Sequence, residues 1–79
     1  MEIRSTMVGT FYWAKMEQSD EVVARIGRKV QKNQVLGRIK ALGLYTDVLS
    51  PIDGKIIGFL LLDDMPVEYG QLILLIEEL

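Results

Sequence analysis

The most informative part of the chain is Ile39-Lys40-Ala41-Leu42-Gly43-Leu44-Tyr45-Thr46-Asp47-Val48. It predicts two β-strands joined by a tight turn, because apolar and β-branched residues flank a glycine that adopts positive φ without steric penalty. We therefore expect a hairpin over about residues 39–48, with Gly43 at its tip.

The rest of the chain also reads as short strands. Seven strands are predicted from β-branched or alternating runs, over residues 2–5, 9–12, 22–26, 35–40, 46–49, 55–61 and 72–77. Turn residues such as Asp53-Gly54 and Tyr69-Gly70 separate them, and no segment keeps a helical apolar period over three turns. Regular short strands with turns between them indicate an all-β sandwich or barrel.

An internal repeat divides the chain into two halves. Four residues recur 37 positions later with the same identity: Val30, Gln34, Ile39 and Leu42 match Val67, Gln71, Ile76 and Leu79. Two others recur 45 positions later, since Ser5 and Gly9 match Ser50 and Gly54. The spacings differ by eight, so the first half carries eight extra residues, which we place in the polar stretch 13–20. Two copies of one unit are predicted, whereas a solenoid needs three or more.

The composition excludes several classes of function. A chain of 79 residues with 49% hydrophobic residues supports one core, so we expect a single domain over residues 1–79. It has no cysteine and no histidine, which excludes disulfides, thiolate metal sites and the usual general base. We expect no catalytic residue, no metal site and no enzymatic activity.

The apolar runs and the start of the chain bear on its location. The longest apolar runs, 59–62 and 72–76, are far shorter than the roughly 20 residues that cross a bilayer. No signal peptide is recognisable, because Glu2 and Arg4 interrupt the first residues. We expect no membrane partner and a cytoplasmic location, or the plastid stroma if a transit peptide has been removed.

Charge is unevenly distributed along the chain. Six basic and no acidic residues lie between Val22 and Thr46, whereas seven acidic residues and the single basic Lys55 follow from Asp47 onward. A basic run can bind nucleic acid or an acidic partner. No aromatic residue interleaves with this run, however, and strand alternation sends its charges to solvent. We expect a solvated face and no nucleic-acid partner.

Three motifs carry a resemblance to a known family: Met-Val-Gly-Thr-Phe-Tyr at 7–12, Ser-Pro-Ile-Asp-Gly at 50–54, and Val-Glu-Tyr-Gly-Gln-Leu-Ile-Leu-Leu-Ile-Glu at 67–77. They resemble the biotinyl domains of the biotinyl/lipoyl family, in particular the biotin carboxyl carrier proteins of acetyl-CoA carboxylase. The resemblance implies a flattened barrel (a barrel-sandwich hybrid) of two four-stranded antiparallel sheets related by a pseudo-twofold axis. It also implies that the insertion at about 13–20 is the family's thumb, which leans toward biotin.

The resemblance breaks at the hairpin tip. The carriers present Ala-Met-Lys-Met there, and biotin acylates the lysine amine, but this chain has Ala41-Leu42-Gly43-Leu44. Gly43 occupies the usual biotinyl-lysine position and has no amine, so biotin is not expected as a cofactor. Lys40 stands where the motif has glutamate, which reverses the charge that a biotin ligase would meet.

Five residues are candidate partner contacts. Leu42, Leu44 and Tyr45 place apolar bulk on or beside the tip around Gly43, and exposed apolar groups can mark a docking site. The methionines of the carrier motif are apolar too, so inherited shape explains these leucines equally well. Trp13 fits either a stacking contact with a partner or, more commonly, a cover over the barrel edge.

The leading functional prediction is a carrier-like protein that cannot be biotinylated at the usual site. It would act as a regulatory or scaffolding partner of a biotin-dependent carboxylase, bound to the biotin carboxylase component or to true carrier subunits. A homo-oligomer is a further expectation. Two alternatives stay open: a cofactor-free lipoyl-like structural module, and an ordinary carrier modified at Lys40 or Lys55.

Overall fold

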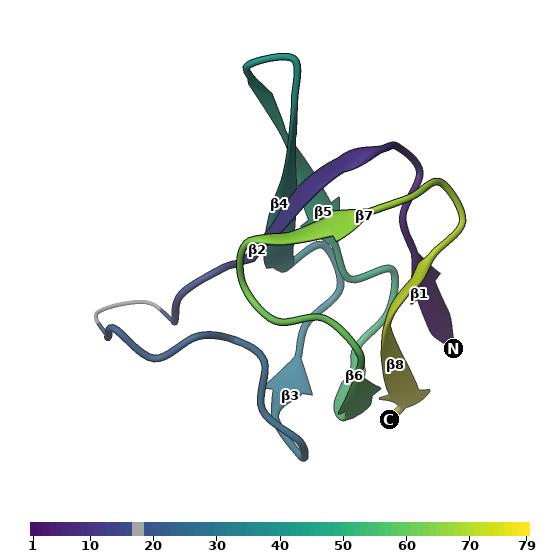
Figure 1. Cartoon of the computed structure of the whole chain (residues 1–79). Coiled ribbons are helices and arrows are strands. Elements are labelled where there is room, and N and C mark those ends of the chain that lie inside the picture. Colours follow the sequence, from purple (N-terminus) through teal and green to yellow (C-terminus); the bar gives the residue numbers. More distant parts are fainter. Residues whose placement is uncertain (17–18) are drawn as a thin grey trace.

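The structure, a computed structural model, describes residues 1–16 and 19–79, and every regular element in these ranges is a β-strand (Figure 1). The eight strands are β1 Glu2–Arg4, β2 Gly9–Trp13, β3 Lys29–Val30, β4 Val35–Ala41, β5 Leu44–Leu49, β6 Gly54–Phe59, β7 Met65–Val67 and β8 Leu72–Glu78. In the described part of the chain, no helix is long and apolar enough to span a membrane.

The strands form two four-stranded antiparallel sheets that face each other across one core. Their orders are β1-β8-β6-β3 and β5-β4-β2-β7. Alternate side chains point inward, as a half-buried strand requires, and fully buried members include Phe11, Leu36, Ile56 and Ile73. The prediction of an all-β flattened barrel is therefore confirmed.

The predicted repeat is present in the strand pairing. Strand β2 of the first half pairs with β7 of the second half, with Gly9 opposite Val67 and Thr10 opposite Pro66. The equivalent strands β6 and β3 pair with Gly54 opposite Val30 and Lys55 opposite Lys29. The same spacings of 37 and 45 residues therefore relate strands β1 to β4 to strands β5 to β8.

The two halves share an equivalent serine hydrogen bond in their loops. The Ser5 hydroxyl donates to the carbonyl oxygen of Met7 over 2.6 Å, and the Ser50 hydroxyl donates to that of Ile52 over 2.7 Å. Both serines are buried, so each hydroxyl needs a partner inside the protein. The serine motifs seen in the sequence therefore satisfy two equivalent turns.

Two equivalent glycines allow the strands to cross closely. A Cβ atom on Gly9 would lie 2.4 Å from the carbonyl oxygen of Lys40, and one on Gly54 would lie 2.6 Å from that of Glu77. No real Cβ atom fits at such distances, so these positions require glycine for space. Their partners Lys40 and Glu77 are again 37 residues apart.

The structure corrects the predicted strand over residues 22–26. Val22 makes only an isolated bridge with Lys15, and the segment that follows consists of bends and turns. Val23 is 2% exposed and packs in the core, so its β-branched side chain reflects burial rather than strand pairing.

Two real strands, β3 and β7, were not predicted. Each has only two or three residues, and β7 contains Pro66, which lacks an amide N–H. The proline is tolerated because β7 lies at a sheet edge. The repeat contained the missing signal, since Lys29–Val30 precedes Pro66–Val67 by the same 37 residues.

Candidate functional site

The hairpin of β4 and β5 projects beyond the body of the barrel, at the end opposite to the two termini (Figure 1). Ala41 pairs with Leu44, so Leu42 and Gly43 form a two-residue loop. Their φ angles are +53° and +80°, as the type I′ hairpin turn requires. Glycine adopts this angle freely, whereas a leucine in the left-handed region is strained.

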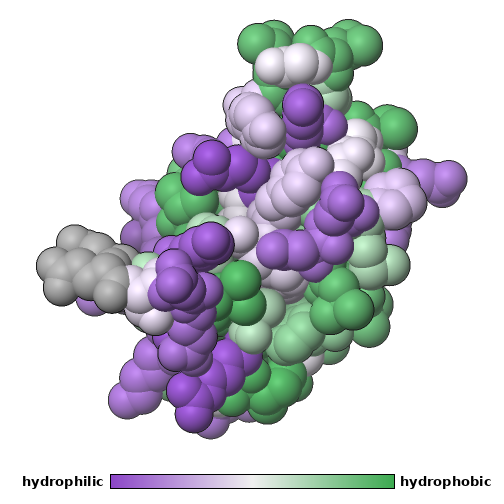
Figure 2. Space-filling view, turned by 60° about the vertical axis from the view of Figure 1, so that its left-hand side comes forward, coloured by the Kyte–Doolittle hydropathy of each residue, from purple (hydrophilic) through white to green (hydrophobic). Residues whose placement is uncertain are grey.

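The tip is apolar and fully exposed. The relative exposure of Leu42 is 102%, that of Leu44 is 73% and that of Tyr45 is 55%. In Figure 2 hydrophobic side chains gather at the top of the molecule, where Figure 1 places the hairpin tip. The four tip residues named from the sequence thus lie together, apart from the core.

Basic and aromatic side chains meet on the outer face of the hairpin. The Lys40 ammonium lies 5.7 Å from the ring centroid of Tyr45, and the Arg38 guanidinium carbon lies 5.8 Å from it. Both distances are within the range of cation–π attraction. Tyr12 of β2 lies 6.4 Å from Tyr45, centroid to centroid. The basic residues of β4 therefore have aromatic neighbours across the sheet, although no aromatic residue interleaves with them along the chain.

Tyr12 also contacts an acidic turn. Its hydroxyl donates a hydrogen bond of 3.2 Å to Asp64. Partial desolvation raises the pKa of Tyr12 above its usual value, and the bond to Asp64 and the nearby carboxylate charges raise it further. The bond to Asp64 therefore favours the protonated, hydrogen-donating phenol over the phenolate.

Trp13 lies in the core and is not available as a partner contact. It is 6% exposed, and its indole N–H donates to the carbonyl oxygen of Leu61 over 2.7 Å. Its ring packs edge-on against Phe11 at 4.9 Å and Phe59 at 5.6 Å. Of the two interpretations given for Trp13, burial supports the structural one and speaks against a partner contact, because a large apolar ring whose polar atom finds an internal partner gains most by burial.

The predicted thumb, residues 13–20, includes two residues, 17 and 18, that lie outside the described part of the chain. Its described flanks are held by backbone hydrogen bonds. The Met16 N–H donates to the carbonyl oxygen of Glu21 over 2.7 Å, and the Val23 N–H donates to that of Ala14 over 2.8 Å. Ala14 N–H in turn donates to Leu36 of β4 over 2.9 Å, so the base of the insertion is fixed to the hairpin sheet.

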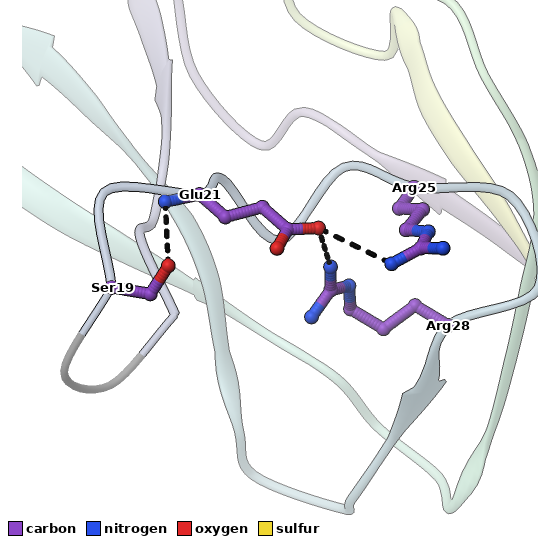
Figure 3. A network of polar contacts seen from close by, with 4 residues as sticks. All are labelled: Ser19, Glu21, Arg25 and Arg28. Carbon is purple, nitrogen blue, oxygen red and sulfur yellow. Dashed lines mark hydrogen bonds and ion pairs between the residues drawn. The ribbon is translucent and has the colours of Figure 1, made fainter.

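A polar network follows the thumb (Figure 3). Glu21 accepts hydrogen bonds from Arg28 at 2.5 Å and from Arg25 at 3.4 Å, and its own backbone N–H donates to the Ser19 hydroxyl at 3.0 Å. The Arg28 side chain is only 12% exposed, whereas that of Glu21 is half exposed at 51%. The network joins the returning arm of the thumb to the start of β3.

An open groove of about 1080 Å³ lies between the described start of the predicted thumb, residues 13–16, and the hairpin. Ala14 and Met16 line it on the thumb side, and Arg38 and Tyr45 line it on the hairpin side. In the ranges that the structure describes, no group of three histidine, cysteine or acidic residues is placed to hold a metal ion. The lining combines apolar side chains with charges of both signs, since it also includes Asp47 and Asp63.

Comparison with known proteins points to one family. The profile of the biotin/lipoyl family described as "Biotin-requiring enzyme" matches residues 1–76. The chain is 33% identical over 70 residues to the biotin carboxyl carrier protein of acetyl-CoA carboxylase from Nostoc sp. The matched region covers 89% of this chain and 38% of that protein. The carrier of the same description from Pyropia yezoensis is 35% identical over 75 residues, covering 95% of this chain and 47% of that protein.

A third carrier of the same description, from Pseudomonas aeruginosa, is 33% identical over 69 residues, covering 87% of this chain and 44% of that protein. The chain thus spans less than half the length of each of these relatives. Domains of this family normally carry covalently attached biotin and are not themselves catalytic. By fold, repeat and sequence, the chain belongs to the biotin/lipoyl family and is a biotin carboxyl carrier-like domain related to the carriers of acetyl-CoA carboxylase.

Proposed function

We propose that this chain is a carrier-like protein that cannot be biotinylated at its hairpin tip. It would act as a non-catalytic regulatory or scaffolding partner of a biotin-dependent acetyl-CoA carboxylase. One observation carries the proposal: the residue at the exposed tip, where the carriers present a lysine, is Gly43.

The chemistry of biotin attachment explains why this residue matters. The cofactor is joined through an amide, which requires a nucleophilic amine, and glycine has no side chain to supply one. Space is not the obstacle, since a Cβ atom on Gly43 would have no neighbour within 4 Å. The position therefore has room for the lysine side chain but lacks its amine.

The nearest amine is poorly placed to replace it. Lys40 lies three residues before the tip, within β4, where its ammonium is 5.7 Å from the Tyr45 ring. Lys55 lies on β6, between Lys29 and Glu77 of the neighbouring strands. Neither lysine is presented on the two-residue loop, so we propose that neither takes biotin.

A carrier surface without the biotin arm would have a defined effect on an assembly. By occupying a carrier position, the chain would hold a biotin carboxylase component or a true carrier subunit without delivering a carboxyl group. The exposed Leu42, Leu44 and Tyr45 supply the apolar contacts for such a position. The result is slower carboxylation at constant amounts of the active subunits.

Biotinylation tests the first part of the proposal. The chain is co-expressed with a biotin ligase and its intact mass is measured; no adduct is expected. The double variant Gly43→Lys with Lys40→Glu restores both motif positions and is expected to gain one biotin. Leu44→Lys is the matched control, because it places an amine one residue from the tip glycine and is expected to stay unmodified. An adduct on the unaltered chain contradicts the proposal.

Binding and activity test the second part. The purified chain is titrated into biotin carboxylase and into a biotinylated carrier, with binding followed by calorimetry and carboxylation by product formation. We expect binding to at least one component and a lower carboxylation rate. If the chain binds neither component, the regulatory role is refuted and a purely structural module explains it better.

A further inference from the structure

Strand β5 is an exposed, unprotected sheet edge. It is the terminal strand of its sheet and has neither proline nor glycine over Leu44–Leu49. Five of its six residues are exposed, and Val48 is partly exposed. Open edges of this kind readily pair with another strand, and proteins usually shorten, charge or cover them.

The other edges are blunted. Among the strands that the structure describes, β7 has three residues including Pro66, β3 has two, and β1 has three with an irregular register. A proline and a short strand both reduce the N–H and C=O groups available to a neighbour. Strand β5 carries only one charged residue, Asp47. It is therefore the edge on which strand addition meets least resistance.

The register of the hairpin shows which groups face outward. A two-residue turn makes the flanking pair, here Ala41 and Leu44, hydrogen-bonded, and bonded and non-bonded pairs then alternate along the strands. Thr46 opposite Ile39 is thus a bonded pair, whereas Tyr45 and Asp47 belong to non-bonded pairs. The backbone groups of Tyr45 and Asp47 consequently point away from β4, toward the open edge.

We propose that two copies of this chain pair antiparallel through β5, about a twofold axis that passes by Thr46. This register places Tyr45 of each copy opposite Asp47 of the other, so the outward backbone groups of both residues are bonded. Each such pair exchanges two hydrogen bonds. The proposal concerns the strand edge and does not depend on the proposed function.

The side chains of β5 are complementary to themselves in this register. On one face Leu44 meets Val48 of the second copy, and Thr46 meets its own equivalent, both of which are favourable cross-strand pairs. On the other face the Asp47 carboxylate of one copy approaches the Tyr45 ring of the other copy. The Lys40 and Arg38 side chains of that other copy lie beside the same ring. A register centred on Asp47 instead would oppose two carboxylates, which is unfavourable. Charge thus disfavours the axis at Asp47, and the cross-strand pairs of Leu44 with Val48 and of Thr46 with Thr46 favour the axis at Thr46.

Cysteine cross-linking tests this register directly, because the chain has no cysteine of its own. In a non-bonded pair the Cα atoms lie about 4.5 Å apart, within the range that a disulfide spans. The Thr46→Cys chain is incubated in a glutathione disulfide buffer, which accepts the two electrons, and covalent dimer is measured over time. Leu44→Cys is the matched control: its equivalent in the second copy would lie about 14 Å away, four residues along the strand.

We expect the Thr46→Cys chain to cross-link at least about tenfold faster than the Leu44→Cys chain, although Leu44 is highly exposed. A mixture of the Leu44→Cys and Val48→Cys chains should form the mixed disulfide in preference to either symmetric one. Equal rates for the Thr46→Cys and Leu44→Cys chains would overturn the proposed register.

Sedimentation of the unaltered chain tests association itself. Its mass of 9.0 kDa should rise toward twice that value with increasing concentration. Asp47→Pro should abolish this rise, because it removes an outward N–H that β4 does not use, and Asp47→Ala, which keeps the N–H, should preserve it. Thermal unfolding confirms that both variants are folded. If the unaltered chain stays monomeric at the highest attainable concentration, the proposal is overturned.

Discussion

Replacing Leu42 by asparagine should stabilise the fold. The backbone at Leu42 has φ +53°, a left-handed conformation that costs an L-residue with an ordinary side chain about 1–2 kcal/mol. Asparagine tolerates this conformation, and Asn-Gly is the preferred pair for the two-residue hairpin turn. The Leu42 side chain is 102% exposed, so its removal takes away no packing.

We therefore expect Leu42→Asn to raise the free energy of unfolding by about 1 kcal/mol, which raises Tm by about 4–8 °C in a domain of this size. Thermal and urea unfolding followed by circular dichroism measure the change. The same substitution at Leu44 is the matched control. Leu44 begins β5, where asparagine is unfavourable, so Leu44→Asn should lower the free energy of unfolding by up to about 1 kcal/mol.

The opposite signs of these two variants test the reasoning. An unchanged or lowered Tm for Leu42→Asn would show that the leucine is not strained or that it makes stabilising contacts in the folded chain. A lower affinity of the more stable Leu42→Asn variant for a carboxylase component would show that Leu42 is retained for binding. That result would link the strained residue to function.

Three further outcomes are expected. Trp13→Phe should destabilise the fold by about 1–3 kcal/mol in urea unfolding, because it leaves the buried carbonyl oxygen that the indole N–H binds without a partner. Gly9→Ala and Gly54→Ala should each cost about 1–3 kcal/mol, and similar losses at both are expected because the added Cβ atom meets a carbonyl oxygen in each half. Tyr12 should ionise at higher pH than a free tyrosine in an ultraviolet titration, and Asp64→Asn should reverse part of this shift. Because folding raises this pKa, the associated stability is present below the usual tyrosine pKa and is lost as the pH rises through the folded value.

Much of the fold could be predicted because the same short sequence motifs occur in both halves of the chain. The matched serines and glycines of the two halves occupy equivalent turns and crossings, where a hydroxyl or a missing Cβ is required. The prediction of a strand over 22–26 was wrong because residue type alone does not separate burial from strand pairing. Burial and strand pairing both favour β-branched residues, so Val22 and Val23 do not distinguish them.

The hairpin, the two halves and the absence of a side-chain amine at residue 43 could all be predicted, since each depends on residue identity and spacing along the chain. The burial of Trp13, the position of Tyr12 and Tyr45 beside the basic residues of β4, and the open edge of β5 are seen only in the folded chain. These properties depend on which strands become neighbours, and residues that meet across a sheet are separated along the chain by distances that no local pattern encodes.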